Sequence, residues 1–174
     1  MDDICDSKEI LYHAEQSQVK GVAIDDYCKS LIISTNKTGN IEQERRRIEG
    51  YLADHHKTVK YKFSNVLATP TGFHVFGATF SGSGSDIFGP LLESNIPIIE
   101  KGFYATSYVT STFFGHWLCD GAPTSLLKDP DETLYFWSPP SWGHTAGYLD
   151  LMGIERINAK YVFLNRCPIA KMSE

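Results

Sequence analysis

Residues 114–120, with the sequence FGHWLCD, contain the side chains best suited to catalysis. Histidine is the commonest general base near neutral pH, and a carboxylate can orient its ring. His116 and Asp120 are four residues apart, so a helix would place both on one face. We therefore predict that His116 acts as a catalytic base and that Asp120 orients it. The alternative is a core histidine packed beside Trp117, with Asp120 capping a helix.

A second group of functional side chains lies in residues 137–144, with the sequence WSPPSWGH. Its prolines stiffen the segment, and its tryptophans offer aromatic faces on which the apolar face of a sugar ring can stack. We predict a substrate-binding surface made of aromatic and histidine side chains from this segment and from residues 108–117. They are Tyr108, Trp117, Trp137, Trp142 and His144. The alternative is a rigid loop whose tryptophans close the core.

Other kinds of chemistry have little support in the sequence. The four cysteines form no C-x-x-C pair, and no H-E-x-x-H or comparable histidine spacing is present. We therefore predict no metal site and no cofactor. The Gly/Ser run at residues 81–85 lacks the Lys-Ser/Thr ending of a phosphate-binding loop and the third glycine of a dinucleotide-binding turn. We expect a flexible loop there.

The length and the net charge of the chain exclude further classes of function. The chain of 174 residues fits one domain, and its formal net charge of -5 argues against broad binding of nucleic acid. No run approaches the roughly 20 apolar residues that span a bilayer. The acidic start of the chain is unlike a secretory signal. We expect a cytoplasmic protein with reduced cysteines and no membrane span.

The first 56 residues are predicted to form a helical N-terminal segment. Within it, residues 7–14 have helical spacing, and residues 41–52 form a charged helix. Residues 31–33 are a short apolar run whose length fits a strand or part of a helix, and residues 38–40 form a turn. This segment supplies none of the candidate site residues.

From residue 57 onwards the pattern predicts an α/β domain. Apolar and polar residues alternate at 59–64, and a turn at 69–72 leads to an aromatic, β-branched run at 73–80, which indicates an antiparallel strand pair. Later elements alternate between strand and helix, which is typical of a mostly parallel sheet with right-handed crossovers. They are strands at 103–114, 134–137 and 161–164, and a helix at 145–152 that ends at Gly153.

These residues resemble glycosyltransferase family 61, whose bacterial members are often called capsular polysaccharide biosynthesis proteins. The resemblance covers residues 59–164 and implies a fold of two Rossmann-like halves with the active site between them. The first half mostly holds the acceptor, and the second mostly holds the nucleotide-sugar donor. Residues 57–174 would then be the acceptor-side, three-layer Rossmann-like domain. The matching runs are FYATSY (103–108), FFGHWLCDGAP (113–123), YLDLMGI (148–154) and the strand, Pro-x-Gly, strand pattern within 61–80.

The resemblance implies inverting transfer of a sugar from a nucleotide sugar to a hydroxyl acceptor, in polysaccharide or glycoconjugate assembly. His116 is the position that would deprotonate the acceptor, and Asp120 would orient it. The sequence ends at Glu174, before the arginine-bearing segment and the Gly-rich donor loop of the family's second half. We therefore expect this chain alone to be inactive, and to use a nucleotide sugar only when a donor half is supplied.

Two other functions stay open at this point. The chain is alternatively a non-catalytic α/β module that binds a glycan or a protein, or a small hydrolase that uses His116 and Asp120 to activate water. If a partner half is missing, the apolar face around Phe114, Trp137 and Trp142 would be only partly covered. We therefore expect self-association or a protein partner.

Overall fold

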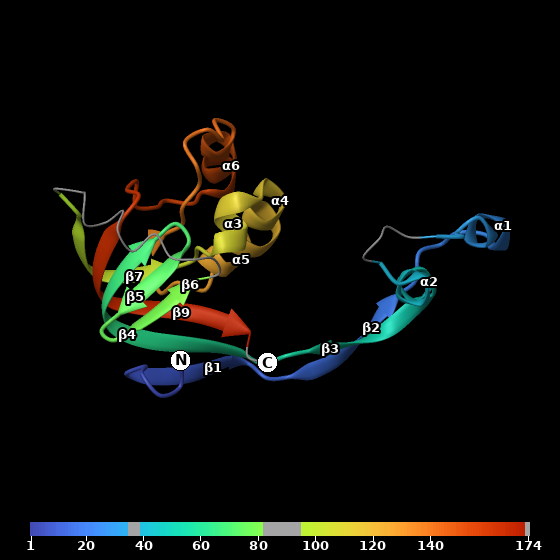
Figure 1. Cartoon of the computed structure of the whole chain (residues 1–174), viewed down its shortest axis with the longest axis horizontal. Helices are drawn as coiled ribbons and strands as arrows, with labels where there is room; N and C mark the ends of the chain where they lie inside the picture. Colours follow the sequence, from blue (N-terminus) through green and yellow to red (C-terminus); the bar gives the residue numbers. More distant parts are fainter. Residues whose placement is uncertain (35–38, 82–94, 173–174) are drawn as a thin grey trace. The chain divides into compact units, whose positions relative to one another are not determined.

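The computed structural model describes residues 1–34, 39–81 and 95–172 (Figure 1). They form two compact units. The larger unit contains Met1–Leu11 and the described part of Val59–Lys171, and the smaller is formed mainly by the described part of Tyr12–Thr58. Residues 82–85 of the expected Gly/Ser loop and residue 38 of the expected turn lie outside the described residues.

The smaller unit is built on a two-stranded antiparallel sheet with two short helices. Its elements are β2 (Glu15–Lys20), α1 (Asp26–Ser30), α2 (Ile41–Glu49) and β3 (Gly50–His55). The Asp25 carboxylate caps α1 by accepting a hydrogen bond from the Cys28 amide, and the Asn40 side chain caps α2 in the same way. None of the described residues of Tyr12–Thr58 is buried, so this unit has no core of its own.

The prediction of a helical N-terminal segment is wrong for residues 7–14. Ser7–Tyr12 is strand β1, and β2 begins at Glu15. A partner far along the chain decides this, since β1 pairs with β4 (Thr58–Thr69), and the Asp6 amide just before β1 donates to the Lys62 carbonyl at 2.8 Å. Helical spacing of a few apolar residues carries no information about such a distant partner.

The rest of the N-terminal segment agrees in part with expectation. The charged helix expected at 41–52 forms as α2 but ends at Glu49, because Gly50 takes a φ of 94° and begins β3. That left-handed φ favours glycine, and a Cβ at this position would also meet the Val19 carbonyl oxygen at 2.7 Å. The apolar run at 31–33 forms no strand.

The larger unit is a mixed sheet with seven strands among the described residues (Figure 1). The strand order is β6-β5-β4-β9-β7-β8, and β1 also pairs with β4. Neighbours β4, β5 and β6 are antiparallel, whereas β7 runs parallel to both β8 and β9. This confirms antiparallel pairing within 59–80 and the parallel strands expected near 134–137 and 161–164. The single strand expected at 73–80 is wrong, because the chain turns at Phe76 and at Gly77, whose φ is 79°, and forms two antiparallel strands there. The strands are β1 (Ser7–Tyr12), β4 (Thr58–Thr69), β5 (Gly72–Val75), β6 (Ala78–Ser81), β7 (Ile98–Tyr104), β8 (Thr133–Tyr135) and β9 (Val162–Met172).

Short helices connect the parallel strands. They are α3 (Tyr108–Thr112), α4 (Phe114–His116), the π-helical turn η2 (Trp117–Gly121), α5 (Ala122–Ser125) and α6 (Thr145–Met152). The strand expected at 103–114 is therefore wrong beyond Tyr104, because Ser107 and Thr110 form a reciprocal cap that starts α3. The helix expected at 145–152 is confirmed, and Gly153 ends it with a φ of 63°.

Each face of the sheet has its own core. Successive residues of a strand point to opposite faces, so Phe103 of β7 faces the helices and Tyr104 faces away from them. Phe103 packs with Trp117 and Leu149, which lie on the connecting helices. Tyr104 packs in a core built from strands and from the segment around Ile157, with no helical residue among its described members.

The structure therefore confirms a mixed α/β fold, in which α4, η2, α5 and α6 contribute residues to the core on one face of the sheet. The Rossmann-like, three-layer arrangement stays a prediction. None of the described helices combines the length and the apolar composition that crossing a membrane requires.

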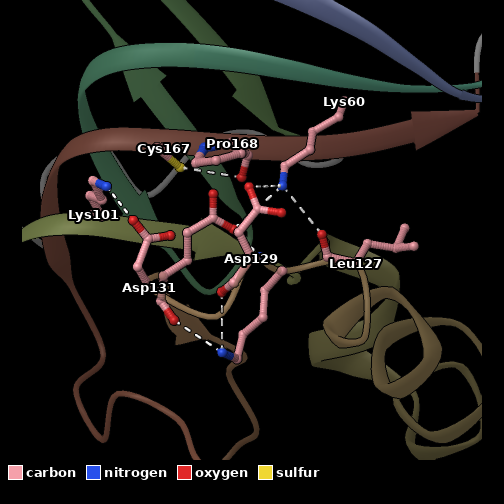
Figure 2. A network of polar contacts seen from close by, with 9 residues as sticks. Lys60, Lys101, Leu127, Asp129, Asp131, Cys167 and Pro168 are labelled. Carbon is pink, nitrogen blue, oxygen red and sulfur yellow. Dashed lines mark hydrogen bonds and ion pairs between the residues drawn. The ribbon is translucent and has the colours of Figure 1, made fainter.

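A buried ion-pair network ties β4 to the segment before β8 (Figure 2). Lys60 is only 2% exposed, and its Nζ lies 3.0 Å from Asp129 Oδ2 and 3.5 Å from Glu132 Oε2. It also donates to the Leu127 carbonyl at 3.3 Å and lies 5.4 Å from the centre of the Phe103 ring. The alternating pattern placed Lys60 on the polar side of a half-buried strand. The structure instead buries both faces of β4 at this point and compensates the charge.

Candidate functional site

His116 and Asp120 form the contact that their spacing predicts. His116 is the last residue of α4, and Asp120 lies in η2, one turn later. His116 Nδ1 lies 2.6 Å from Asp120 Oδ2. The two side chains are 54% and 60% exposed, so the pair is open to solvent. His116 Nε2 makes no hydrogen bond to a described residue, which leaves one ring nitrogen available to a ligand.

The backbone under this pair widens from an α-helix to a π-helical turn. The Ala122 amide donates to the Trp117 carbonyl, five residues back. Single π-turns inserted in helices are often found at functional sites. A Cβ at Gly121 would lie 2.5 Å from the Phe136 ring, so glycine lets this turn approach the sheet closely. The turn thus holds Asp120 outward while its other side packs on Phe136, the residue directly after β8 (Thr133–Tyr135).

Trp117 anchors the turn in the core and does not reach the surface. It is fully buried, and its ring stacks on Phe136 at 4.8 Å and on Phe114 at 5.8 Å. Its indole Nε1 is buried and has no hydrogen-bond partner among the described residues. The structure therefore corrects the placement of Trp117 on a substrate-binding surface, because a fully buried ring cannot stack on a sugar. Trp117 instead fixes the position of the neighbouring His116.

Phe114 gathers a cluster of aromatic side chains next to this anchor. Its ring lies edge-on to His144 at 4.4 Å and to Trp142 at 6.0 Å, and it contacts Tyr148 at 5.4 Å. His144 and Tyr148 are exposed, and Trp142 is half-buried. Phe114 belongs to the same short helix as His116, so the structure brings His144 and Trp142 to the element that carries the predicted base. Tyr148 was not among the predicted site residues, although a helix beginning at Thr145 places it four residues after His144 and so near that side chain.

Trp137 is separated from this cluster. It is half-buried against the core on the strand side of the sheet, and its backbone amide donates to Thr106 Oγ1 at 2.8 Å. Trp142 packs against the core on the helix side. The prediction that both tryptophans form one sugar-binding surface is therefore wrong, and so is the single apolar face expected around Phe114, Trp137 and Trp142. The chain passes from one face of the sheet to the other between residues 137 and 142.

Tyr108 lies apart from both the Phe114 cluster and Trp137, in a cavity of about 510 Å³ at the carboxyl ends of β7 and β9. It is half-buried there, beside Tyr104 and Thr106. Burial raises the pKa of the Tyr104 phenol well above its ordinary value, so this group stays neutral. Burial likewise raises the pKa of the Cys167 thiol. These two groups are structural and not reactive at neutral pH.

Within residues 1–34, 39–81 and 95–172, no group of three or more histidine, cysteine or acidic side chains is arranged to hold a metal ion. Comparison with family models, with curated proteins and with solved structures gives no match. The interpretation of the site therefore depends on the residues and their geometry.

Proposed function

We propose that this chain is the acceptor-side part of a cytoplasmic glycosyltransferase that moves a sugar from a nucleotide sugar to a hydroxyl acceptor, in polysaccharide or glycoconjugate assembly. One observation carries the proposal: His116 Nδ1 is held 2.6 Å from Asp120 Oδ2, while Nε2 is open on an exposed side chain. The resemblance of residues 59–164 to glycosyltransferase family 61 supports it, and the sheet would then be the family's first Rossmann-like half.

The proposed chemistry follows from which atoms of His116 and Asp120 donate hydrogen bonds and which accept them. An ionised carboxylate only accepts hydrogen bonds, so His116 carries its proton on Nδ1 and donates it to Asp120. The lone pair on Nε2 is then free to take the proton of an acceptor hydroxyl. The acceptor oxygen forms a bond to the anomeric carbon of the donor sugar, the bond from that carbon to the diphosphate breaks, and the nucleoside diphosphate leaves with its electron pair. Attack opposite the leaving group inverts the anomeric configuration.

The two residues have different roles in this proposal. His116 is the catalytic base. Asp120 is a positioning residue that selects the tautomer and fixes the ring, and Trp117 holds the turn that carries both. The cluster of Phe114, His144 and Trp142 would border the acceptor as it approaches His116.

The test combines activity with stability. The chain is mixed with a separately produced donor half of a family 61 glycosyltransferase, a panel of nucleotide sugars and methyl glycoside acceptors, and released nucleoside diphosphate is measured. We expect release with the wild-type chain and at least a 100-fold loss with H116A. D120N should lower the rate less than H116A does, because Asp120 only positions the base. Because both side chains are more than half exposed, both variants should unfold within about 0.5 kcal/mol of wild type. Full activity of H116A, or its unfolding at much lower denaturant, would contradict the proposal.

A second candidate function has an observation in its favour. The His116–Asp120 pair lies on an open surface, whereas the cavity that contains Tyr108 is lined by other residues. This separation suits a non-catalytic module that binds a glycan in the cavity. Glycan binding by the chain, with no transfer in any combination of donor half and nucleotide sugar, would favour this module.

A further inference from the structure

The cavity at the carboxyl ends of β7 and β9 has the construction of a small-molecule site. Its volume of about 510 Å³ falls within the range of roughly 300–1,000 Å³ that is typical of ligand pockets. Ligands of α/β proteins bind outside the carboxyl ends of parallel strands, and β7 and β9 are parallel neighbours. All the lining residues belong to the larger unit.

Aromatic rings form one side of this cavity. Phe73 of β5 and Phe80 of β6 stack at 4.8 Å with 22° between their planes, and Tyr104 meets Phe73 edge-on at 5.5 Å. The Tyr104 hydroxyl donates to the Thr69 carbonyl at 3.1 Å, which holds that ring in place. Phe73 and Tyr104 are each 4% exposed, so they make this side of the cavity rigid, and the half-buried Phe80 and Tyr108 are the rings that a ligand can reach.

Hydroxyl groups form the polar part of the lining. Thr106 Oγ1 accepts from the Trp137 amide and donates to the Tyr135 carbonyl at 3.5 Å, and Thr79 Oγ1 lies 3.0 Å from His74 Nδ1, so each is oriented by the protein. A hydroxyl has one donor and two acceptor positions, so Thr106 keeps one acceptor position for a ligand and Thr79 keeps two positions. The Tyr108 hydroxyl makes no hydrogen bond to a described residue, and the ring is only half-buried. Tyr108 therefore offers a ring face and an uncommitted hydroxyl at the same place.

Charge is sparse around the cavity. Among its described lining residues, Lys171 carries the only charged side chain, Met1 adds its α-ammonium, and none is acidic. No arginine is among these residues, so a carboxylated or phosphorylated ligand would lack the bidentate contact that usually holds it. A pyranose ring matches the lining better, because it has an apolar C–H face for an aromatic wall and hydroxyls around its edge.

We infer that this cavity binds a neutral pyranose, the sugar ring of the acceptor, with Tyr108 as a principal contact. The inference rests on the proposed function, since it names the class of acceptor. Tyr108 and Val109 both line the cavity from α3, which is followed directly by α4, the helix that carries His116.

The experiment measures binding without requiring transfer. The full chain, with its tyrosine rings isotopically labelled, is titrated with methyl glycosides of glucose, galactose, mannose and xylose, and separately with methyl glucuronide and p-nitrophenol. We expect at least one neutral glycoside to shift the Tyr108 ring signals. Y108A should weaken that binding roughly three- to tenfold, as expected when one aromatic contact is lost. F76A is the matched control, because Phe76 is fully exposed in the turn between β5 and β6 and does not line the cavity.

The outcomes separate this inference from the proposed function. Binding of a neutral glycoside that Y108A weakens and H116A leaves unchanged supports the inference, whether or not transfer is ever seen. Binding that H116A weakens and Y108A leaves unchanged overturns the inference and leaves the proposed function standing. Preference for p-nitrophenol or for methyl glucuronide overturns the neutral-sugar class, and failure of every glycoside to bind overturns the inference altogether.

Discussion

Replacing Lys60 by methionine should be one of the most destabilising conservative changes in the larger unit. The ammonium is 2% exposed and compensates Glu132, whose side chain is 7% exposed. Removing one partner of a buried ion pair leaves the other charge unpaired, which costs about 3–5 kcal/mol. Glu132 Oε2 still accepts from the Asp129 amide at 2.7 Å, so we expect the lower end of that range, about 3 kcal/mol. Asp129 itself is more than half exposed and adds little.

The assay is equilibrium unfolding in urea, supported by the thermal midpoint. A loss of about 3 kcal/mol in a chain of this length lowers Tm by roughly 6–12 °C. Lys62→Met is the matched control, since Lys62 lies on the same face of β4 two residues later but is exposed. That control should change stability by no more than about 0.5 kcal/mol. The double variant Lys60→Met/Glu132→Gln should recover most of the loss, because it removes both charges and keeps an acceptor for the Asp129 amide.

Two results would refute this reasoning. Equal effects of Lys60→Met and Lys62→Met would mean that Lys60 is not buried with its charge compensated. Failure of the double variant to recover stability would mean that the loss comes from packing around Phe103 and not from an unpaired carboxylate.

Further predictions concern packing and pH. Gly121→Ala should destabilise by about 1–3 kcal/mol in urea unfolding, because its Cβ would meet the Phe136 ring, whereas Gly115→Ala has open space and should be neutral. Burial lowers the pKa of His74, so the folded state resists its protonation. The free energy of unfolding should therefore be unaffected above pH 6.5 and fall below it. His74→Gln should reduce that fall, measured by comparing unfolding curves at about pH 7.5 and about pH 5. Tyr104→Phe should cost about 1 kcal/mol through the lost bond to the Thr69 carbonyl, without changing the slope of the urea transition.

Local signals explain most of what the sequence predicted correctly. The helix at Thr145–Met152 is recognisable because Gly153 supplies a left-handed end, and β8 because the apolar run at 134–137 is followed by the turn signal of Pro139 and Pro140. The same kind of local signal was present but overlooked at Ser107, whose hydroxyl caps α3 three residues before Thr110. Aromatic and β-branched density over 103–114 favoured a strand, and the cap overruled it.

Contacts between distant residues explain what the sequence could not predict. Nothing local marks Lys60 as buried, since its partners Asp129 and Glu132 are about seventy residues away. The strand character of Glu15–Lys20 depends in the same way on β3. The separation of Trp137 from Trp142 depends on the chain changing faces of the sheet, which residue spacing does not reveal.

The segment 114–120 reconciles the two interpretations that its sequence left open. One interpretation was a core histidine beside a tryptophan, and the other was an exposed base beside a carboxylate. The structure gives the buried position and the exposed positions to neighbouring residues. Trp117 takes the buried position, stacked between Phe114 and Phe136, and His116 and Asp120 take the exposed ones. A rigid core residue immediately after the base limits how far the His116 backbone can move, which is the pre-organisation that a general base needs. The buried tryptophan is thus an argument for the proposed role of His116 and not against it.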